Sequence, residues 1–152
     1  MTAYIEKYLS PEVDCAYEGW SVQRLQNLLN RKELARVPVI ASDHQLVGSV
    51  GSADIYQLMN QEETYRAQLV NNNFRRTTGH DVENLDELTQ WARRALVYCT
   101  VHQIMQPAGN QIDISANESA VKQALQLTSQ QTLWVTRQGI LIGQITAAKL
   151  LA

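Results

Sequence analysis

Residues 36–55 read RVPVIASDHQLVGSVGSADI, and this stretch decides the fold. Two runs rich in valine and isoleucine, at residues 36–41 and 46–50, lie on either side of the turn-like Ser42-Asp43-His44-Gln45. This pattern predicts two strands joined by a tight turn. A short helix is expected to follow directly, over residues 52–60.

The same pattern returns later in the chain. Leu133-Trp134-Val135-Thr136 aligns with residues 37–40, and Leu141-Ile142-Gly143-Gln144-Ile145 aligns with residues 46–50. Pro107 follows Pro11 at an offset of 96, and Trp134 follows Pro38 at the same offset. Blocks that recur in one order at nearly one offset indicate an internal duplication, which fixes the architecture.

Each half of the duplication is predicted to contain a strand, a helix, two strands and a closing helix. The first helix of each half carries an apolar stripe, with Ser21 as the N-cap in the first half and Asn117 or Ser119 in the second. The stripes are formed by Val22, Leu25, Leu28 and Leu29, and by Val121, Ala124, Leu125 and Thr128. The remaining elements are strands over 13–16, 111–114, 133–136 and 140–145 and a closing helix over 146–151. One unit of roughly 50 residues is too small to be stable alone, so the two are expected to pack as one module.

Residues 61–94 have no counterpart in the repeat and are predicted to form a helical insertion. Two helical stretches are expected there, separated by loops at residues 71–73 and 77–80. The second stretch, over 84–96, is amphipathic, with acidic residues in its first turn and arginines in its last. It is expected either to cover the module or to meet a partner. The predicted division is a first repeat at 1–60, a helical insertion or linker at 61–99 and a second repeat at 100–152, in an α/β (α+β) fold.

The composition excludes several classes of protein. The chain has 152 residues, 45% of them hydrophobic and 18% charged, so it has enough apolar residues for a core and does not have the composition of a disordered chain. Its 13 Lys and Arg against 15 Asp and Glu give a net charge of −2, which argues against nucleic acid or an anionic membrane as a partner. No run approaches the ~20 apolar residues of a membrane span, and Glu6 and Lys7 stand where a secretory signal needs apolar residues. A soluble, cytoplasmic protein is expected.

The sequence contains no recognisable catalytic or metal-binding constellation. His44, His80 and His102 lack the short spacing of a metal site, and Cys15 and Cys99 form no CxxC pair. A Cys-His nucleophile would need one of these cysteines near a histidine in space, and nothing in the sequence indicates this. We therefore expect no catalytic residue, no metal and no enzymatic activity.

The order of these elements resembles a known family. A proline-marked lead-in, a strand, a helix, hydrophobic-Pro-Val, a turn, Leu-Val-Gly-x-Val and a helix together are similar to the cystathionine-beta-synthase (CBS) domain, and two such domains in tandem form a Bateman module. The match is clearest at residues 36–55 and, in the second half, at 100–107 and 143–146. The resemblance implies a non-enzymatic regulatory module that commonly dimerises and binds AMP, ADP, ATP or S-adenosylmethionine in clefts between its repeats.

Ligand sites in this family often use a Gly-hydrophobic-x-Thr/Ser-x-x-Asp stretch. The carboxylate accepts hydrogen bonds from ribose, and the hydroxyl, near a helix start, assists with phosphate. Here the first half keeps the carboxylate as Asp54 but has Gly51 at the hydroxyl position, while the second half keeps the hydroxyl as Thr146 but has Lys149 in place of the carboxylate. Lysine cannot accept a hydrogen bond from ribose, so the cleft served by Asp54 is the better candidate. The resemblance implies these ligand-binding residues: Asp54 for ribose, Val13, Val37 and Pro38 beside adenine, and Ser52, Arg36 and Thr146 near phosphate.

Two functions from different classes are consistent with these residues. The first is a sensor of an adenosine-containing ligand, in which binding couples the two halves, or two subunits, and shifts the activity of an unidentified regulated protein. The second is a ligand-free protein-interaction or dimerisation module with degenerate nucleotide sites, which the split motifs and the amphipathic insertion favour. The second function predicts that assembly is lost when Trp91 or Leu88 becomes polar. A homodimer is the expected assembly.

Overall fold

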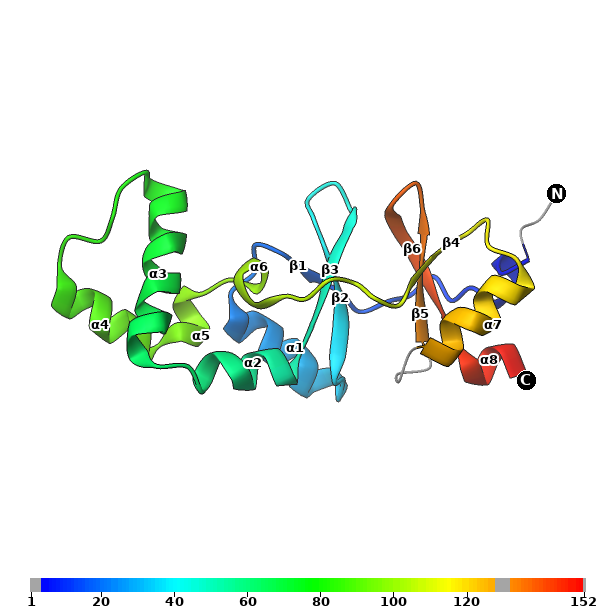
Figure 1. The fold of residues 1–152 in the computed structure, drawn as a ribbon, viewed down its shortest axis with the longest axis horizontal. Helices are drawn as coiled ribbons and strands as arrows, with labels where there is room; N and C mark the ends of the chain where they lie inside the picture. Colours follow the sequence, from blue (N-terminus) through cyan, green and yellow to red (C-terminus); the bar gives the residue numbers. More distant parts are fainter. Residues whose placement is uncertain (1–3, 128–131, 152) are drawn as a thin grey trace.

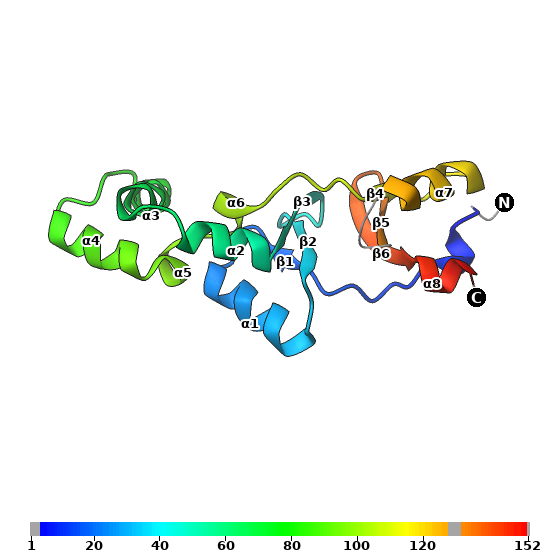
Figure 2. The ribbon, with the colours of Figure 1, turned by 60° about the horizontal axis from the view of Figure 1, so that its bottom comes forward.

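The structure, a computed structural model, describes residues 4–127 and 132–151. It contains two three-stranded sheets of identical topology, β1-β2-β3 and β4-β5-β6. In each sheet the first strand is parallel to the second, and the second is antiparallel to the third. The two sheets lie side by side in the middle of an elongated molecule, with the insertion helices at one end and both chain termini at the other (Figures 1 and 2). The predicted mixed α and β fold and its internal duplication are confirmed.

The first repeat contains β1 (Ala16–Tyr17), α1 (Val22–Lys32), β2 (Arg36–Ile40), β3 (Leu46–Gly51) and α2 (Ser52–Met59). As predicted, the Ser21 side chain caps α1 by accepting a hydrogen bond from the Arg24 N–H at 3.2 Å, and all four residues of the apolar stripe are buried. The prediction of a first strand over 13–16 was wrong in its bounds. Only Ala16 and Tyr17 pair with β2, whereas Val13 lies in the gap between the two repeats.

The second repeat contains β4 (Gln111–Asp113), α7 (Glu118–Leu127), β5 (Thr132–Arg137), β6 (Ile140–Thr146) and α8 (Ala147–Leu151). Of the two caps that the sequence left open for α7, Asn117 is the one used, since its Oδ1 accepts a hydrogen bond from the Ala120 N–H at 2.9 Å. The closing helix begins at Ala147, one residue later than predicted, because Thr146 is its N-cap and accepts from the Lys149 N–H. Thr128, which was assigned to the apolar stripe, lies outside the described residues.

The lead-in segment of each repeat crosses over to the other repeat, which the sequence did not predict. Ser10, after the 3₁₀ turn η1 (Glu6–Tyr8), exchanges two backbone hydrogen bonds with Gln144 of β6, with N···O distances of 2.8 and 2.9 Å. Gln106, after α6 (Val101–Ile104), exchanges two with Ser49 of β3, both at 2.8 Å. The cores follow the same exchange: Ile5 is buried in the core of the second repeat, and Val101 in that of the first. The repeats are therefore interlocked.

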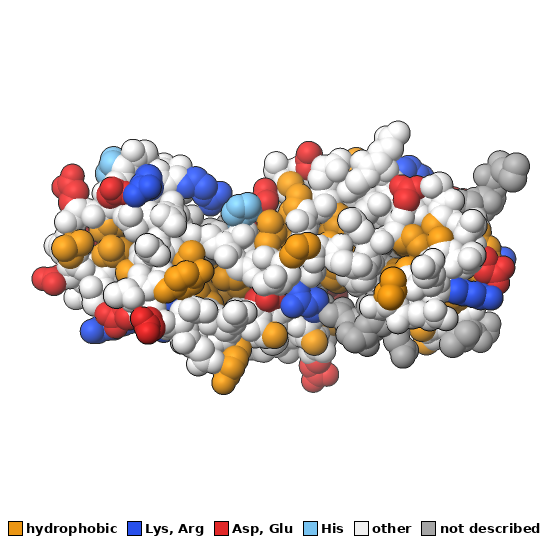
Figure 3. Space-filling view, viewed as in Figure 1, with side chains coloured by type: hydrophobic (Ala, Val, Ile, Leu, Met, Phe, Trp, Pro, Cys, Tyr) orange, Lys and Arg blue, Asp and Glu red, His pale blue; other side chains and the backbone are white. Residues whose placement is uncertain are grey.

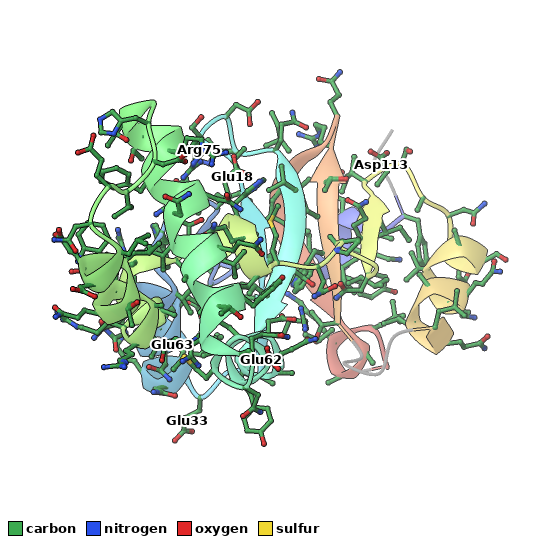
Figure 4. The ribbon with its side chains drawn as sticks, turned by 60° about the vertical axis from the view of Figure 1, so that its left-hand side comes forward. Glu18, Glu33, Glu62, Glu63, Arg75 and Asp113 are labelled. Atoms are coloured by element: carbon green, nitrogen blue, oxygen red, sulfur yellow. The ribbon has the colours of Figure 1, made fainter. Side chains whose placement is uncertain are left out.

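The insertion forms α3 (Glu63–Thr78), α4 (Leu85–Arg93) and α5 (Ala95–Tyr98). The prediction of loops at 71–73 and 77–80 was wrong for residues 71–73, 77 and 78, because α3 runs through these positions. The side chain of Asn71 is satisfied by a tertiary bond, accepting from the Val82 N–H at 2.9 Å, and Thr78 bonds back to the Phe74 carbonyl at 2.7 Å. The helix ends at Gly79, whose φ of +85° is a left-handed cap. In Figure 4, Glu62 and Glu63 lie at the start of α3 and Arg75 near its end, an arrangement that the helix dipole favours.

The amphipathic stretch predicted at 84–96 is divided into α4 and α5 at Arg94, whose backbone leaves the helical region (φ −113°, ψ 44°). Ala92 and Ala95 are fully buried. Leu88 and Trp91 pack against the core of the first repeat. The part of the apolar face formed by Leu88 and Trp91 therefore packs on the module, which is one of the two roles that the sequence left open.

Candidate functional site

The carboxylate of Asp54 is buried at the start of α2 and accepts three hydrogen bonds. One oxygen, Oδ2, accepts from the Arg36 guanidinium at 3.0 Å and from the Gly51 N–H at 2.9 Å. The other, Oδ1, accepts from Nε2 of Gln106 at 3.3 Å. The residue is only 6% exposed. Asp54 therefore connects the start of its own helix, the strand β2 and the lead-in segment of the second repeat.

Arg36, the first residue of β2, is the ionic partner of Asp54. Its Nη1 also donates to the Oγ of Ser49, a buried residue of β3, at 2.8 Å. The register of the sheet brings these groups together, because Arg36 pairs with Gly51 directly before α2. A buried carboxylate is stable as a charged group only when it is paired and hydrogen-bonded, and Arg36 supplies both.

Arg36 also lines a cavity between the two repeats. The cavity has a volume of about 60 Å³ and is lined by Val13, Asp14, Leu34, Arg36, Val37 and Pro38 of the first repeat and Trp134 and Gln144 of the second. Four of the seven predicted ligand-binding residues (Val13, Arg36, Val37 and Pro38) are thus gathered around one cavity. Trp134 was not assigned to the site from the sequence, although its offset of 96 from Pro38 is a signal that could have found it.

The other three predicted residues, Asp54, Ser52 and Thr146, do not line this cavity. Ser52 is the exposed first residue of α2, and its N–H donates to the Ala35 carbonyl at 3.0 Å. The hydroxyl of Thr146, at the place in the second repeat that corresponds to Gly51, is already engaged as the N-cap of α8. The Nζ of Lys149, which replaces the carboxylate there, donates to the Oγ of Ser10 at 3.2 Å. The second half therefore presents a lysine held by a lead-in segment where the first half presents Asp54.

A second cavity, of about 150 Å³, lies on the other side of Asp54. Its lining comes from α2, α3 and the lead-in of the second repeat: Asp54, Gln57, Leu58, Gln61, Tyr65, Leu69, Gln103, Ile104, Met105 and Gln106. Gln103 donates to the Leu69 carbonyl of α3 at 2.7 Å, so the lead-in is also tied to the insertion. One member of the Arg36–Asp54 pair therefore faces the inter-repeat cavity, and the other faces a cavity next to the insertion.

The thiols are not activated for nucleophilic chemistry. Burial raises the pKa of Cys99 to about 11. Burial, and then the neighbouring Asp14 carboxylate, raise the pKa of Cys15. A reactive cysteine requires the opposite shift, because the thiolate is the nucleophile. Across residues 4–127 and 132–151, no three His, Cys, Asp or Glu side chains form a cluster that could hold a metal ion.

Within the part of the chain that the structure describes, no helix is both long and apolar enough to cross a membrane. Acidic and basic side chains are interspersed on the face shown in Figure 3, with no large field of one sign. This distribution agrees with the near-balanced composition.

Comparison with known proteins identifies the repeat. The family model for the CBS domain matches residues 5–61. A comparison with curated protein sequences found no match. Among solved structures, the CBS-pair protein CBSX2 from Arabidopsis thaliana superimposes with a TM-score of 0.66 at 19% identity, covering 99% of this chain and 93% of its own.

Two further structures of similar fold contain nucleotides. CBSX2 in complex with AMP has a TM-score of 0.62 at 22% identity, covering 98% of this chain and 93% of that one. CbpB in complex with c-di-AMP has a TM-score of 0.65 at 18% identity, covering 98% and 82%. The expected resemblance is confirmed: the CBS-domain family model matches residues 5–61, and the chain as a whole has the fold of the solved CBS-pair structures.

Proposed function

We propose that this chain is a non-enzymatic regulatory module that binds an adenosine-containing ligand in the cleft between its two repeats. The observation that carries the proposal is Arg36, which lines a cavity to which both repeats contribute and is paired with Asp54, whose carboxylate lines the neighbouring cavity. A guanidinium and a carboxylate are the groups that phosphate and ribose hydroxyls require. The AMP complex of CBSX2 and the c-di-AMP complex of CbpB, which share the fold, support this ligand class.

Each residue has a distinct role in the proposed site. Val13, Val37 and Pro38 provide apolar contacts to adenine, with Trp134 opposite them on the second repeat. Arg36 turns from Asp54 to the phosphate, and the carboxylate of Asp54, which is bonded to Arg36 and lines the neighbouring cavity, then accepts hydrogen bonds from the ribose. Ser52 at the start of α2 and Thr146 at the start of α8 assist with phosphate when the cleft is open.

Binding has to widen the cleft, and this gives the module a way to signal. The cavity of about 60 Å³ is far below the ~300 Å³ at the lower end of small-molecule pockets. A ligand that fits only the wider arrangement shifts the population towards it. Because each lead-in crosses to the other repeat, the movement is shared by the proposed units at 1–60, 61–99 and 100–152. In this proposal the module works in the cytoplasm. There a regulated protein, or a second copy in a homodimer, senses the wider arrangement of the repeats.

Calorimetry and thermal melts with AMP, ADP, ATP, S-adenosylmethionine and c-di-AMP test the proposal. A ligand present at 100 times its Kd stabilises the folded state by about 2.7 kcal/mol. We expect this stabilisation from at least one of the five, and we expect Asp54→Asn and Arg36→Gln to remove it. Asp81→Asn is the matched control, because Asp81 is also paired with an arginine but lies in the insertion. The absence of heat and of a melting shift with all five ligands would overturn the proposal.

A second candidate, the ligand-free interaction module, is favoured by one observation. In both halves the groups that would bind ligand are already engaged: Asp54 accepts three hydrogen bonds and Thr146 caps α8. This function predicts that the five nucleotides have no effect while the chain still self-associates. Measuring binding and mass on the same samples separates the two candidates.

A further inference from the structure

Trp134 is buried between the two repeats, outside the core of its own repeat. Its neighbours in β5, Leu133 and Val135, are fully buried in that core. Successive side chains of a strand point to opposite faces of the sheet, so Trp134 lies on the face turned toward the first repeat. There it is 3% exposed and lines the cavity between the repeats. The indole is therefore part of the boundary between the two halves of the module.

The first repeat has a much smaller side chain at the equivalent position. Pro38 precedes Trp134 by the repeat offset of 96, and their strands, β2 and β5, belong to the two neighbouring sheets in Figure 1. Pro38 and Trp134 line the same cavity, one from each repeat. The duplication thus gives this cavity two equivalent positions, and one of them holds the largest side chain of the lining.

The indole of Trp134 takes up space that a ligand would need. An apolar cavity of about 150 Å³ is enough to bind an aromatic ring, whereas the cavity beside Trp134 has a volume of about 60 Å³. Indole and purine are both flat systems of two fused rings and are similar in size. The volume that the indole occupies therefore has the shape of a purine base.

The backbone limits how much space the repeats can provide by moving apart. Besides the two crossings of the lead-in segments, the tips of the two hairpins are joined: the Leu46 N–H donates to the Gly139 carbonyl at 2.9 Å, and the Leu141 N–H donates to the His44 carbonyl at 3.2 Å. A side chain can turn about its own bonds without breaking any of these ties. The space for a base therefore has to come in part from Trp134.

We propose that Trp134 is a built-in plug of the inter-repeat cavity: its indole occupies the place of a purine base, and the base binds only when the indole has moved out. Side chain and ligand then compete for one place, and the apparent affinity for the ligand is reduced by the fraction of molecules in which the plug is displaced. The nucleotide part of this inference rests on the proposed function, whereas the plug itself can be tested with free bases.

Calorimetry with AMP tests the competition through the sign of a substitution. Trp134→Phe shrinks the plug and should bind AMP about tenfold more tightly than the wild type if nine-tenths of the wild-type molecules are plugged. A tryptophan that only contacts the ligand would have the opposite effect, because its loss weakens binding. Trp20→Phe is the matched control and should leave the affinity unchanged, since Trp20 does not line this cavity. Unchanged or weaker binding of AMP by Trp134→Phe would overturn the plug.

Thermal melts with free indole and free adenine test the plug without a nucleotide. Trp134→Ala empties the place of the indole, so both compounds should raise its melting temperature by about 2 °C or more, with no shift for the wild type. Trp20→Ala is the control, because Trp20 is only partly buried and its removal leaves no closed space. Trp134→Leu keeps an apolar side chain and serves in the same test if Trp134→Ala does not fold.

The free bases also separate this inference from the proposed function. If neither the wild type nor Trp134→Phe binds AMP, the proposed function fails, while a shift with indole and adenine in Trp134→Ala still supports the plug. No shift with either compound in a folded Trp134 variant would overturn the plug and leave nucleotide binding to be judged from the wild type. A shift with indole alone would also overturn it, because the space would then not accept a purine.

Discussion

Gly48 and Gly143 occupy equivalent positions in β3 and β6, and the lead-in of the opposite repeat lies directly against each of them. A Cβ on Gly48 would be 2.6 Å from the carbonyl oxygen of Gln106, and a Cβ on Gly143 would be 2.6 Å from that of Ser10. Both oxygens belong to the backbone, which cannot move aside as the end of a flexible side chain could. The glycine that follows Leu46-Val47 and Leu141-Ile142 is therefore required, because the backbone of a lead-in segment passes too close for any side chain.

Gly48→Ala is expected to destabilise the chain by about 1–3 kcal/mol or more, because the added methyl group must displace the Gln106 backbone. Gly143→Ala should have an effect of the same size at the other crossing. Chemical denaturation monitored by circular dichroism measures both changes. Gly19→Ala is the control, because nothing lies within 4 Å of a Cβ at that position. A Gly48→Ala variant as stable as the wild type would show that the lead-in does not cross there.

Local pattern was enough to predict the order of the elements in each repeat, although not the bounds of β1. Ser21 and the stripe that begins at Val22 specify α1, since capping and helical spacing act within a few residues. The crossing of the lead-ins could not be predicted, because nothing in Ser10 or Gln106 records which strand they join. The course of α3 through Asn71 likewise depends on a tertiary bond to Val82, which overrides the turn preference of asparagine.

Four of the residues that the resemblance assigns to ligand binding lie together: Val13, Arg36, Val37 and Pro38 line one cavity. Their role in binding stays a prediction. The contact of Gln106 with Asp54 was missed, because these residues are 52 positions apart and meet only through the crossing. Family pattern identifies positions that are equivalent in each repeat, whereas contacts between the repeats are set by packing.

The Arg36–Asp54 pair should contribute measurably to stability apart from any ligand. Asp54→Asn leaves the guanidinium of Arg36 without its counter-charge in a site where the carboxylate is 6% exposed. We expect a loss of about 1–3 kcal/mol, the range for a buried charged hydrogen bond. Arg36→Met should be destabilising for the reciprocal reason.

The double variant separates the interaction energy of the Arg36–Asp54 pair from the effects of their other neighbours. Because the two groups contact each other, the effects of Asp54→Asn and Arg36→Met should not add, with a coupling of about 0.5–3 kcal/mol in a double-mutant cycle. Denaturant titrations of the four proteins supply the numbers. Strict additivity would mean that the ion pair is not formed in solution.

The C-terminal end of α3 should contribute less to the stability of the fold at acidic pH. Hydrogen bonds from Arg75 and then Asn71 hold the pKa of Asp81 below its ordinary value, so the folded state binds this proton less readily than the unfolded chain. The stabilisation is present above the unfolded pKa of about 3.9 and is lost as the pH falls through the lower pKa of the folded state.

Thermal melts of the wild type and Asp81→Asn reveal this contribution. The wild type should be the more stable at pH 7, and the difference should shrink below about pH 4 as the carboxylate is protonated. Salt near 1 M should also reduce the difference at pH 7, because the pair is exposed and therefore screened. A difference that grows on acidification would have the wrong sign for this carboxylate.

The two cysteines should differ sharply in their reactivity. Cys99 is fully buried beside the first-repeat core, and its pKa of about 11 leaves about 0.1% of the thiol ionised at pH 8. Cys15 is only partly buried, although its pKa is also raised. A chromogenic disulfide reagent at pH 8 should therefore modify Cys15 slowly in the folded protein, and both thiols once denaturant is added.

In a single-thiol variant, the reaction rate of the remaining cysteine measures how often the packing of the insertion opens. In Cys15→Ser the remaining thiol is Cys99, which lies directly after α5 and reacts only when the packing of α5 against α1 is lost. Its rate should rise steeply with denaturant and should rise further in Trp91→Ala, which removes an aromatic contact with Tyr98. A rate equal to that of an exposed thiol in the native state would mean that α5 does not cover the first repeat.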